Sequence, residues 1–349
     1  MGHFSGQLLI EPLGLLHGKA ARQAVARGVA RWFAGGPRAY ALARLIGPEH
    51  EHTILPVAAL PPAWEAAARR ISAPAPDAGL PPGQQVMGII NVTPDSFSDG
   101  GQHDRVETAL ARIKALHAAG CQIVDIGGES TRPGAPAVSA EAEWGRIGPV
   151  IRAVRACSAL DGLHLSIDTR QAAVMDQALA AGATLINDVS ALTHDPAARA
   201  VVARHGCPVM LMHMRGTPET MRAHTAYGDV AVDVVRELGQ RVEAAVAAGI
   251  ARARILVDPG IGFAKTLEGN LTLLARLPLL ANLGCRVVLG TSRKRMIGEL
   301  AHEPDAAARD PGTIAASLPG MVFPGVVLRV HNATAMIQAM RVQQGLDQQ

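Results

Sequence analysis

From residue 86 onward the chain alternates short apolar runs with longer, alanine-rich amphipathic runs. Short apolar runs are typical of buried strands, and the longer runs have the 3.6-residue period of helices that pack on a core. Eight such pairs fill about 260 residues, which is the number and size of an eight-stranded parallel barrel. The strands we expect are residues 86–90, 122–126, 163–167, 184–186, 209–212, 255–257, 286–289 and 326–330.

Glycines mark the expected ends of several helices between these strands. Gly120, Gly182 and Gly249 stand where a helix C-cap is expected, because glycine adopts the left-handed conformation at little cost. The helices that the period predicts most clearly are residues 106–119, 172–181, 230–248 and 267–279.

A doubly wound sheet is the alternative to the barrel. It usually has fewer strands and a glycine-rich fingerprint after the first one. Here the first strand is followed by Asn91-Val92-Thr93-Pro94. We therefore expect an α/β protein of the TIM (β/α)8 barrel class.

The residues before the barrel form two further segments. Residues 72–85 are crowded with proline and glycine, and proline lacks a backbone donor, so this stretch is expected to be a linker. It separates the barrel, residues 86–349, from a small N-terminal α+β appendage, residues 1–71, in which no chemistry is visible. Within the appendage we expect strands at 8–10 and 54–57 and helices at 19–33 and 62–71.

Composition excludes several classes of partner. The net charge is +3 and the pI is near 8.8, and no block of Lys and Arg suggests a nucleic-acid footprint. No apolar run approaches the roughly 18 residues that span a bilayer, and no secretory signal is recognisable. The four cysteines form no C-x-x-C pair. We expect a cytoplasmic protein with no nucleic-acid or membrane partner.

Polar side chains follow all eight expected strands. A single Asp after a strand is often only the cap of the next helix. In a parallel barrel, however, these positions converge on the C-terminal rim, where the sites of such barrels lie. Eight coincidences indicate a polar pocket, formed by Asn91, Asp125, Glu129, Asp168, Asn187, Asp188, His213, Asp258, Ser292, Arg293, Lys294, Arg329 and His331.

The side chains of this rim suit a particular kind of ligand. Asp168, Asn187 and Asp258 would bind a ring with adjacent N–H donors, such as the guanidine-like edge of a pterin, and Lys294 adds a donor. Arg329, His331 and Asn91 lie on strands that become neighbours when the barrel closes. That set suits a phosphate, with or without a cation.

The first two loops after strands, residues 93–101 and 127–134, are polar and glycine-containing, as loops that close over a site often are. No His and Cys triad suggests zinc, and no G-x-S-x-G elbow suggests covalent serine catalysis.

From about residue 86 to 342 the chain resembles the dihydropteroate synthases. Any one of the matching segments would be weak alone, but all eight occur in the family's order and spacing. They are residues 87–101, 123–135, 166–170, 186–189, 212–221, 257–267, 290–298 and 328–332.

The resemblance implies a homodimeric transferase of folate biosynthesis that joins a pterin diphosphate to p-aminobenzoate, with Mg²⁺ as cofactor. The family is thought to lose diphosphate first, leaving a pterin methylene cation that the arylamine attacks. Catalytic roles fall to Asp95, Lys294, Arg329 and His331. The pterin is implied to contact Asp168, Asn187, Asp258, Phe263, Lys294 and Met212, and p-aminobenzoate to contact Thr131, Arg132, Pro133, Phe97 and Ser292. The diphosphate is implied to contact Asn91, Arg329 and His331, with Asn91 also ligating the metal.

Two positions depart from the family pattern. Asn332 stands where the family usually has Asp, and Ala264 stands in a turn where it usually has Gly. An Asn can still cap a helix, and Ala would cost about 1 kcal/mol if the turn needs a positive φ.

Two rival functions remain at the level of sequence. A pterin-dependent methyltransferase barrel would share the Asp and Asn pterin ligands but would not require the first two loops or Ser292-Arg293-Lys294. A catalytically silent pterin-binding paralogue is the second, and Asn332 and the appendage are the features that keep it open.

Overall fold

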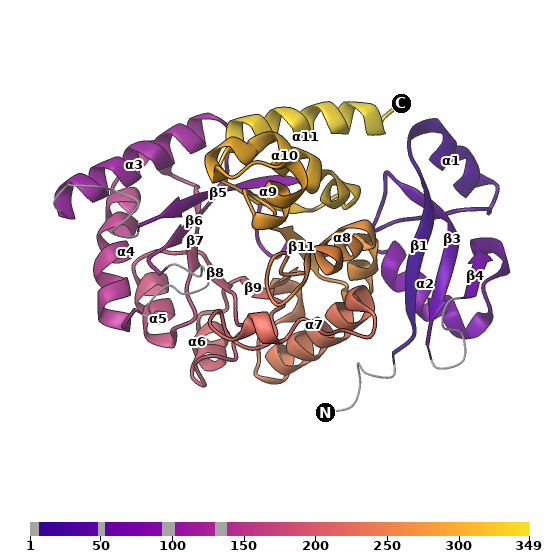
Figure 1. Ribbon diagram of the computed structural model, residues 1–349, viewed down its shortest axis with the longest axis horizontal. Coiled ribbons are helices and arrows are strands. Elements are labelled where there is room, and N and C mark those ends of the chain that lie inside the picture. Colours follow the sequence, from indigo (N-terminus) through magenta and orange to yellow (C-terminus); the bar gives the residue numbers. More distant parts are fainter. Residues whose placement is uncertain (1–6, 48–52, 93–101, 130–137) are drawn as a thin grey trace.

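Eight parallel strands close into a barrel in the order β10-β11-β12-β5-β6-β7-β8-β9, with helices around it (Figure 1). The computed structural model describes residues 7–47, 53–92, 102–129 and 138–349. All eight expected strands are found within two residues of their predicted ends, so the (β/α)8 barrel is confirmed. They are β5 (Gln85–Asn91), β6 (Ile123–Gly127), β7 (His164–Asp168), β8 (Leu185–Asp188), β9 (Val209–Met212), β10 (Ile255–Asp258), β11 (Arg286–Leu289) and β12 (Val327–Val330).

Local signals in the sequence set the ends of the surrounding helices. Asp229 and Thr266 cap two of them through their side-chain oxygens, which satisfies backbone donors of the first turn. Gly120, Gly182 and Gly249 have φ of 107°, 105° and 94°, as expected for residues that end a helix. The helices are α3 (Gln102–Ala118), α4 (Ala140–Arg155), α5 (Ala172–Ala180), α6 (Ala198–His205), α7 (Val230–Ala247), α8 (Leu267–Ala275), α9 (Arg295–Ala301), α10 (Asp310–Ser317) and α11 (Ala333–Asp347).

The helix expected at 267–279 is shorter than predicted. It ends at Ala275, and a 3₁₀ segment, η7 (Leu277–Leu283), follows. Pro278 lacks the N–H that would continue the α-helical hydrogen bonding, which explains the change.

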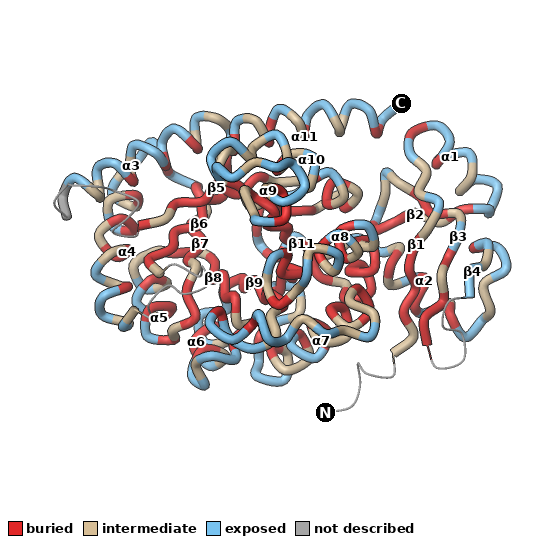
Figure 2. The backbone as a smooth tube through the Cα atoms, viewed as in Figure 1, coloured by how far each residue is buried: buried red, intermediate tan, exposed pale blue. Residues whose placement is uncertain are grey.

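Inside the barrel, side chains alternate with the two-residue period of a strand. One apolar layer is formed by residues near the starts of the strands, and Figure 2 shows the strands buried. Two residues further along, the same inward face carries Asp125, Asn187, Asp258 and Arg329. The layer beneath them consists of Met87, Ile123, Leu185, Met210, Leu256, Val288 and Val327.

The proline-rich segment before β5 closes the floor of this layer. Ala78 and Leu80 are buried in the same apolar cluster as the strand residues. Arg286, at the start of β11, is buried and donates hydrogen bonds to the carbonyls of Asp77 (2.9 Å), Gly83 (2.6 Å) and Gly325 (2.6 Å). The expected boundaries at residues 71 and 85 stay predictions, but the segment between them packs against the barrel.

The expected α+β appendage is confirmed and contains an antiparallel sheet in which β3 pairs with β1, β2 and β4. The helix expected at 19–33 is wrong in length, because Gly28 takes a φ of 71° and the chain turns into a strand. Strand β3 was not expected, since its Ala, Leu and Arg residues favour a helix over a strand. The elements are β1 (Leu9–Leu16), α1 (Gly18–Ala26), β2 (Arg31–Trp32), β3 (Ala39–Ile46), β4 (Thr53–Pro56) and α2 (Glu65–Ser72), the last preceded by two 3₁₀ turns, η1 (Val57–Ala59) and η2 (Pro62–Trp64).

The appendage docks on the side of the barrel near η7 and the end of α11 (Figure 1). The Asn282 amide accepts from the N–H of Ile10 at 3.0 Å and donates to its carbonyl at 2.8 Å. Arg276 pairs with Glu11 at 2.8 Å, and Arg38 with Asp347 at 2.8 Å. Buried side chains of the appendage belong to the same apolar cluster as the outer face of the barrel, so the two share one core.

A substitution at Leu80, which lies under the apolar layer of the barrel, tests whether the linker supports the barrel. We predict that Leu80→Ala lowers the free energy of unfolding by about 2–5 kcal/mol, because it opens a cavity under the barrel. Chemical denaturation measures the change, with Leu300→Ala at an exposed position of α9 as the control. Equal, small effects of both variants would show that the linker does not support the barrel.

Candidate active site

Asp125 lies at the centre of the polar layer. Its side chain is fully buried, and its Oδ1 accepts from the Ser166 hydroxyl at 2.5 Å. Its Oδ2 accepts from the amide of Asn187 at 3.0 Å and from Nε of Arg329 at 2.6 Å. This carboxylate therefore connects β6, β7, β8 and β12. The sequence placed Asp125 on the rim without a role, although its period-two relation to Ile123 already directed it inward.

Arg329 crosses the barrel between two carboxylates. Its Nη2 donates to Oδ2 of Asp168 at 2.8 Å, while its Nε donates to Asp125. Burial opposes the charge, but the two carboxylates outweigh burial and raise the pKa of Arg329. Burial in turn raises the pKa of Asp168, against the pull of Arg329. Nη1 of Arg329 has no partner within the described part of the chain, so it remains a free donor.

Asp258 and Lys294 form a second charged group in the same pocket. Asp258 Oδ1 accepts from the N–H of Gly260 at 2.7 Å, and burial raises the pKa of this carboxyl although Lys294 lowers it. Lys294 donates to the Ile261 carbonyl and lies 4.7 Å from the ring centroid of Phe263. Burial lowers the pKa of Lys294 to about 8. Met212 lies beside this group, since a Cβ on Gly260 would stand 3.4 Å from its Cγ.

Several acceptors of the pocket are left over. Asp258 Oδ2, Asn187 Oδ1 and Asp168 Oδ1 have no hydrogen-bond donor among the described residues. Gly290 leaves room beside them, because a Cβ there would stand 3.7 Å from Asp258 Oδ2. Two carboxylate oxygens and an amide oxygen next to an ammonium group complement a flat ring with neighbouring N–H donors.

His331 is oriented by Ser292. The Ser292 hydroxyl accepts from the backbone N–H of His331 at 3.1 Å and lies 2.9 Å from its Nδ1. The Ser292 oxygen has a second acceptor site as well as its own proton, so the contact with Nδ1 fixes the position of the ring for either tautomer. Burial, together with Arg293 and Arg329, lowers the pKa of His331 to about 4. The imidazole is therefore neutral near pH 7.

Asn91, at the end of β5, stands next to this region. A Cβ on Gly127 would lie 3.8 Å from its Oδ1 and 3.5 Å from the Cβ of Asp168. The Asn91 amide forms no hydrogen bond with another described residue. No group of three or more His, Cys, Asp or Glu side chains in the described ranges could hold a metal by itself.

The two departures from the family pattern have clear structural settings. The Asn332 side chain caps α11 by accepting from Ala335 at 3.2 Å, as expected, and it also donates to Asp310 at 3.0 Å. Ala264 has a φ of 51°, so the turn does need the left-handed conformation. The condition for the expected cost of about 1 kcal/mol is therefore met, and the cost itself stays a prediction.

Five of the predicted site residues cannot be compared with the structure. They are Asp95, Phe97, Thr131, Arg132 and Pro133, which lie outside the described residues. Ser292 contacts His331, and its predicted role toward p-aminobenzoate stays a prediction.

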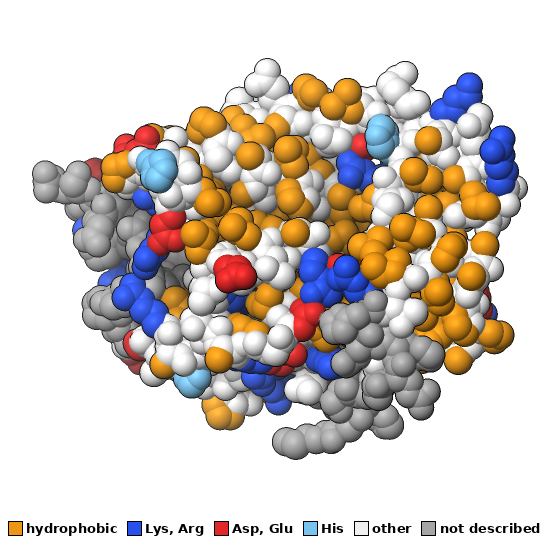
Figure 3. All heavy atoms as spheres, turned by 45° about the vertical axis from the view of Figure 1, so that its right-hand side comes forward, with side chains coloured by type: hydrophobic (Ala, Val, Ile, Leu, Met, Phe, Trp, Pro, Cys, Tyr) orange, Lys and Arg blue, Asp and Glu red, His pale blue; other side chains and the backbone are white. Residues whose placement is uncertain are grey.

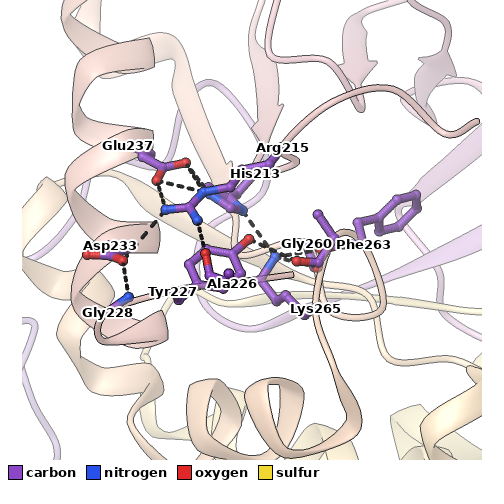
Figure 4. A network of polar contacts seen from close by, with 11 residues as sticks. His213, Arg215, Ala226, Tyr227, Gly228, Asp233, Glu237, Gly260, Phe263 and Lys265 are labelled. Carbon is purple, nitrogen blue, oxygen red and sulfur yellow. Dashed lines mark hydrogen bonds and ion pairs between the residues drawn. The ribbon is translucent and has the colours of Figure 1, made fainter. Parts of the chain in front are cut away.

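A second polar network lies behind the pocket, and the sequence did not predict it (Figure 4). His213 Nε2 lies 2.9 Å from Glu237 of α7, and its Nδ1 lies 3.0 Å from Nζ of Lys265. Arg215 donates to the same Glu237 carboxylate and stacks on Tyr227, 3.8 Å from the ring centroid. Burial lowers the pKa of His213 to about 4. Of these residues, only His213 could be identified from the sequence, because it is a polar residue that follows an expected strand.

Comparison with known proteins agrees with this geometry. Residues 87–331 match the family described as "Pterin binding enzyme". The chain belongs to the dihydropteroate synthase family. It is 44% identical over 261 residues to a Synechocystis sp. protein named dihydropteroate synthase, covering 75% of this chain and 89% of the relative. An Escherichia coli relative of the same name is 40% identical over 257 residues, covering 74% and 89%.

Solved structures of the family share the fold. A Xanthomonas albilineans dihydropteroate synthase with 4-aminobenzoic acid superimposes with a TM-score of 0.70 at 46% identity, covering 77% of this chain and 94% of that one. The Xanthomonas albilineans enzyme in complex with 7,8-dihydropteroate gives 0.68 at 43% identity, covering 78% and 98%.

The buried His213 predicts a dependence of stability on pH. Its folded pKa lies below the ordinary 6.5, so the unfolded chain binds more protons between pH 6.5 and 4, and stability falls as pH decreases through that window. We predict that the wild type loses about 2 kcal/mol more than His213→Gln between pH 7 and 5.

Denaturant unfolding at the two pH values measures this difference. The pKa of Glu237 is lowered to about 2, so its own contribution is lost only at lower pH. His302→Gln, at an exposed position, is the control and should follow the wild type. An equal slope for His213→Gln and wild type would mean that His213 titrates in the folded protein with its ordinary pKa.

Proposed function

We infer that the chain condenses 6-hydroxymethyl-7,8-dihydropterin diphosphate with p-aminobenzoate, giving 7,8-dihydropteroate and diphosphate in folate biosynthesis. The observation that carries this function is the set of free acceptors on Asp168, Asn187 and Asp258 beside the Lys294 ammonium group, in a chain 44% identical to a dihydropteroate synthase. The enzyme is a transferase that moves a pterinylmethyl group to an arylamine.

The pterin is proposed to lie flat in the polar layer. The free oxygens of Asp258, Asn187 and Asp168 would accept its N–H groups, and Lys294 would donate to its ring carbonyl or ring nitrogen. Met212 and Phe263 border the same space and supply apolar contact for the ring faces.

The reaction breaks the bond between the pterin methylene carbon and the diphosphate oxygen, then forms a carbon–nitrogen bond to the arylamine, whose nitrogen releases one proton to solvent. Negative charge develops on the departing diphosphate, and we propose that Nη1 of Arg329 and the imidazole of His331 would donate to it. Positive charge develops on the pterin, and the carboxylates of the pocket, with Asp95, would stabilise it. No protein nucleophile is required.

Mg²⁺ is proposed to bind at Asn91. The residues fit this ion in one respect, because the Asn91 amide oxygen is a hard ligand without a partner among the described residues. Mg²⁺ usually keeps waters and substrate oxygens in its shell, so a single protein ligand is sufficient. When bound, the ion would neutralise charge on the diphosphate.

The p-aminobenzoate subsite is proposed to consist of Phe97, Thr131, Arg132, Pro133 and Ser292. Because the Ser292 hydroxyl also orients His331, this serine would lie between the arylamine and the diphosphate.

We also propose a homodimer located in the cytoplasm. No described helix is long and apolar enough to cross a bilayer. Figure 3 shows hydrophobic side chains spread over the face that carries the appendage. Exposed apolar residues on that appendage and on α11 include Leu42, Ile54, Val342 and Leu346. Sedimentation measures the assembly directly, and a monomer at micromolar concentration would exclude it.

Turnover by the purified chain tests the function. Given the pterin diphosphate, p-aminobenzoate and Mg²⁺, it is expected to form dihydropteroate, and EDTA is expected to stop the reaction until Mg²⁺ is restored. Binding of the pterin without product would identify a silent paralogue. Binding of a methyl folate in preference to the pterin diphosphate would identify a methyltransferase barrel.

Asp258→Asn tests the pterin subsite. The amide keeps an oxygen for Gly260 but turns an N–H toward the substrate donors, which leaves a buried donor unpaired at about 1–3 kcal/mol. Calorimetry with a non-reactive pterin should show affinity weaker by roughly 10- to 100-fold. Asp176→Asn, the same change at an exposed carboxylate of α5, is the control. Unchanged affinity would remove Asp258 from the pocket.

A further inference from the structure

The loop between β10 and α8, residues 259–264, has an unusual backbone. Gly260, Gly262 and Ala264 all have positive φ, at 67°, 84° and 51°. Glycine adopts positive φ at little cost, so the strain is at Ala264, and such strain persists only where surrounding contacts hold it. The loop begins next to Asp258 and carries Phe263, so its placement affects two residues of the pterin subsite.

Side chains from outside the loop hold its carbonyl groups. Lys265 Nζ donates to the carbonyls of Gly260 and Phe263, both at 2.9 Å. Tyr227 donates its hydroxyl to the Ala264 carbonyl at 3.0 Å. On the pocket side, Lys294 donates to the Ile261 carbonyl. The loop therefore has the ammonium group of Lys294 on one side and that of Lys265 on the other; Figure 4 shows Lys265 with Gly260 and Phe263.

Each of the three N–H donors of the Lys265 ammonium group has an acceptor. An ammonium group has three donors, and its third acceptor is Nδ1 of His213 at 3.0 Å. That nitrogen can accept because the neutral ring carries its proton on Nε2, facing Glu237 at 2.9 Å. Arg215 donates to the same carboxylate and holds it in place. Glu237 thus selects the tautomer of His213, and His213 completes the set of acceptors around Lys265.

Two groups held by Lys265 are linked to side chains that we assign to the pterin. Gly260, whose carbonyl Lys265 holds, gives its own N–H to Asp258 Oδ1 at 2.7 Å, which leaves Oδ2 free. Phe263, whose carbonyl Lys265 also holds, presents its ring to Lys294 at 4.7 Å. A displaced Lys265 would move both groups at once.

We propose that Lys265 is a positioning residue for the pterin subsite, holding Gly260 and Phe263 so that the Asp258 carboxylate and the Phe263 ring take their binding positions. Lys265 does not touch the substrate. The proposal rests on the assignment of Asp258 and Phe263 to the pterin, made above.

Lys265→Met tests the proposal, because it removes the three donors and keeps the apolar stem. The Michaelis constant for the pterin diphosphate is expected to rise tenfold or more, while that for p-aminobenzoate stays within about twofold. A purely structural lysine would lower the active fraction, and with it kcat, without changing either constant. Calorimetry with a non-reactive pterin should show the same weakening as the Michaelis constant. An unchanged pterin constant would overturn the proposal.

Two further variants test whether the effect of Lys265→Met comes from positioning, from a general loss of loop stability, or from the loss of a charge. Tyr227→Phe loosens the same loop at Ala264 but leaves Gly260 and Phe263 held, so its pterin constant should change by less than about threefold. Lys265→Arg keeps the charge but cannot direct three converging donors, and it should not restore affinity. An effect of Tyr227→Phe equal to that of Lys265→Met, or full rescue by Lys265→Arg, would contradict the proposal.

A third variant covers the case in which Lys265→Met does not fold. Lys265→Gln keeps a donor for one of the two carbonyls and should give an intermediate pterin constant, whereas an unchanged constant would again overturn the proposal. Asp258→Asn distinguishes the two levels of inference. If it weakens pterin binding while the Lys265 variants do not, the subsite stands and the positioning role fails. If neither changes binding, the subsite assignment itself fails.

Discussion

The buried ion pairs of Arg329 are the interaction on which the upper half of the barrel depends. One guanidinium from β12 satisfies Asp125 of β6 and Asp168 of β7 across the interior. Burying a carboxylate is costly unless it is paired and hydrogen-bonded, and removing one partner leaves the other charge exposed to that full cost. Nη1 of Arg329 and Oδ1 of Asp168 have no hydrogen-bond partner among the described residues and so can bind a ligand. The charges that would bind the substrate are thus also the charges that connect three strands.

This arrangement requires a dry floor beneath it. The apolar layer at the strand starts, closed below by Ala78 and Leu80, excludes water from under the polar layer. In such surroundings charge interactions are stronger than in water. The segment before β5 and the appendage that leads into it therefore take part in the electrostatics of the site, although neither contributes a side chain to it.

The sequence predicted most of the barrel because strand period and rim placement are local rules. Rim placement alone does not separate Asp125, which is a centre of the site, from Asp188, which accepts from Ser190 and Leu192 in the next turn. The difference is one of parity: Asp125 shares the inward face with Ile123, and Asp188 follows the inward Asn187. The pairing of Glu237 with His213 could not be predicted, because it depends on which face of α7 packs against the end of β9.

Asp258 is the common counter-charge of two lysines on opposite sides of one loop. Burial lowers the pKa of Lys294 to about 8 and that of Lys265 to about 7, while Asp258 acts on both in the opposite direction, supporting their charge. Lys265 donates to two carbonyls of the loop between them and Lys294 to one, so carbonyl oxygens of the loop lie against both ammonium groups. A ligand whose N–H groups donate to Asp258 would bind the same carboxylate that stabilises the charges of Lys294 and Lys265.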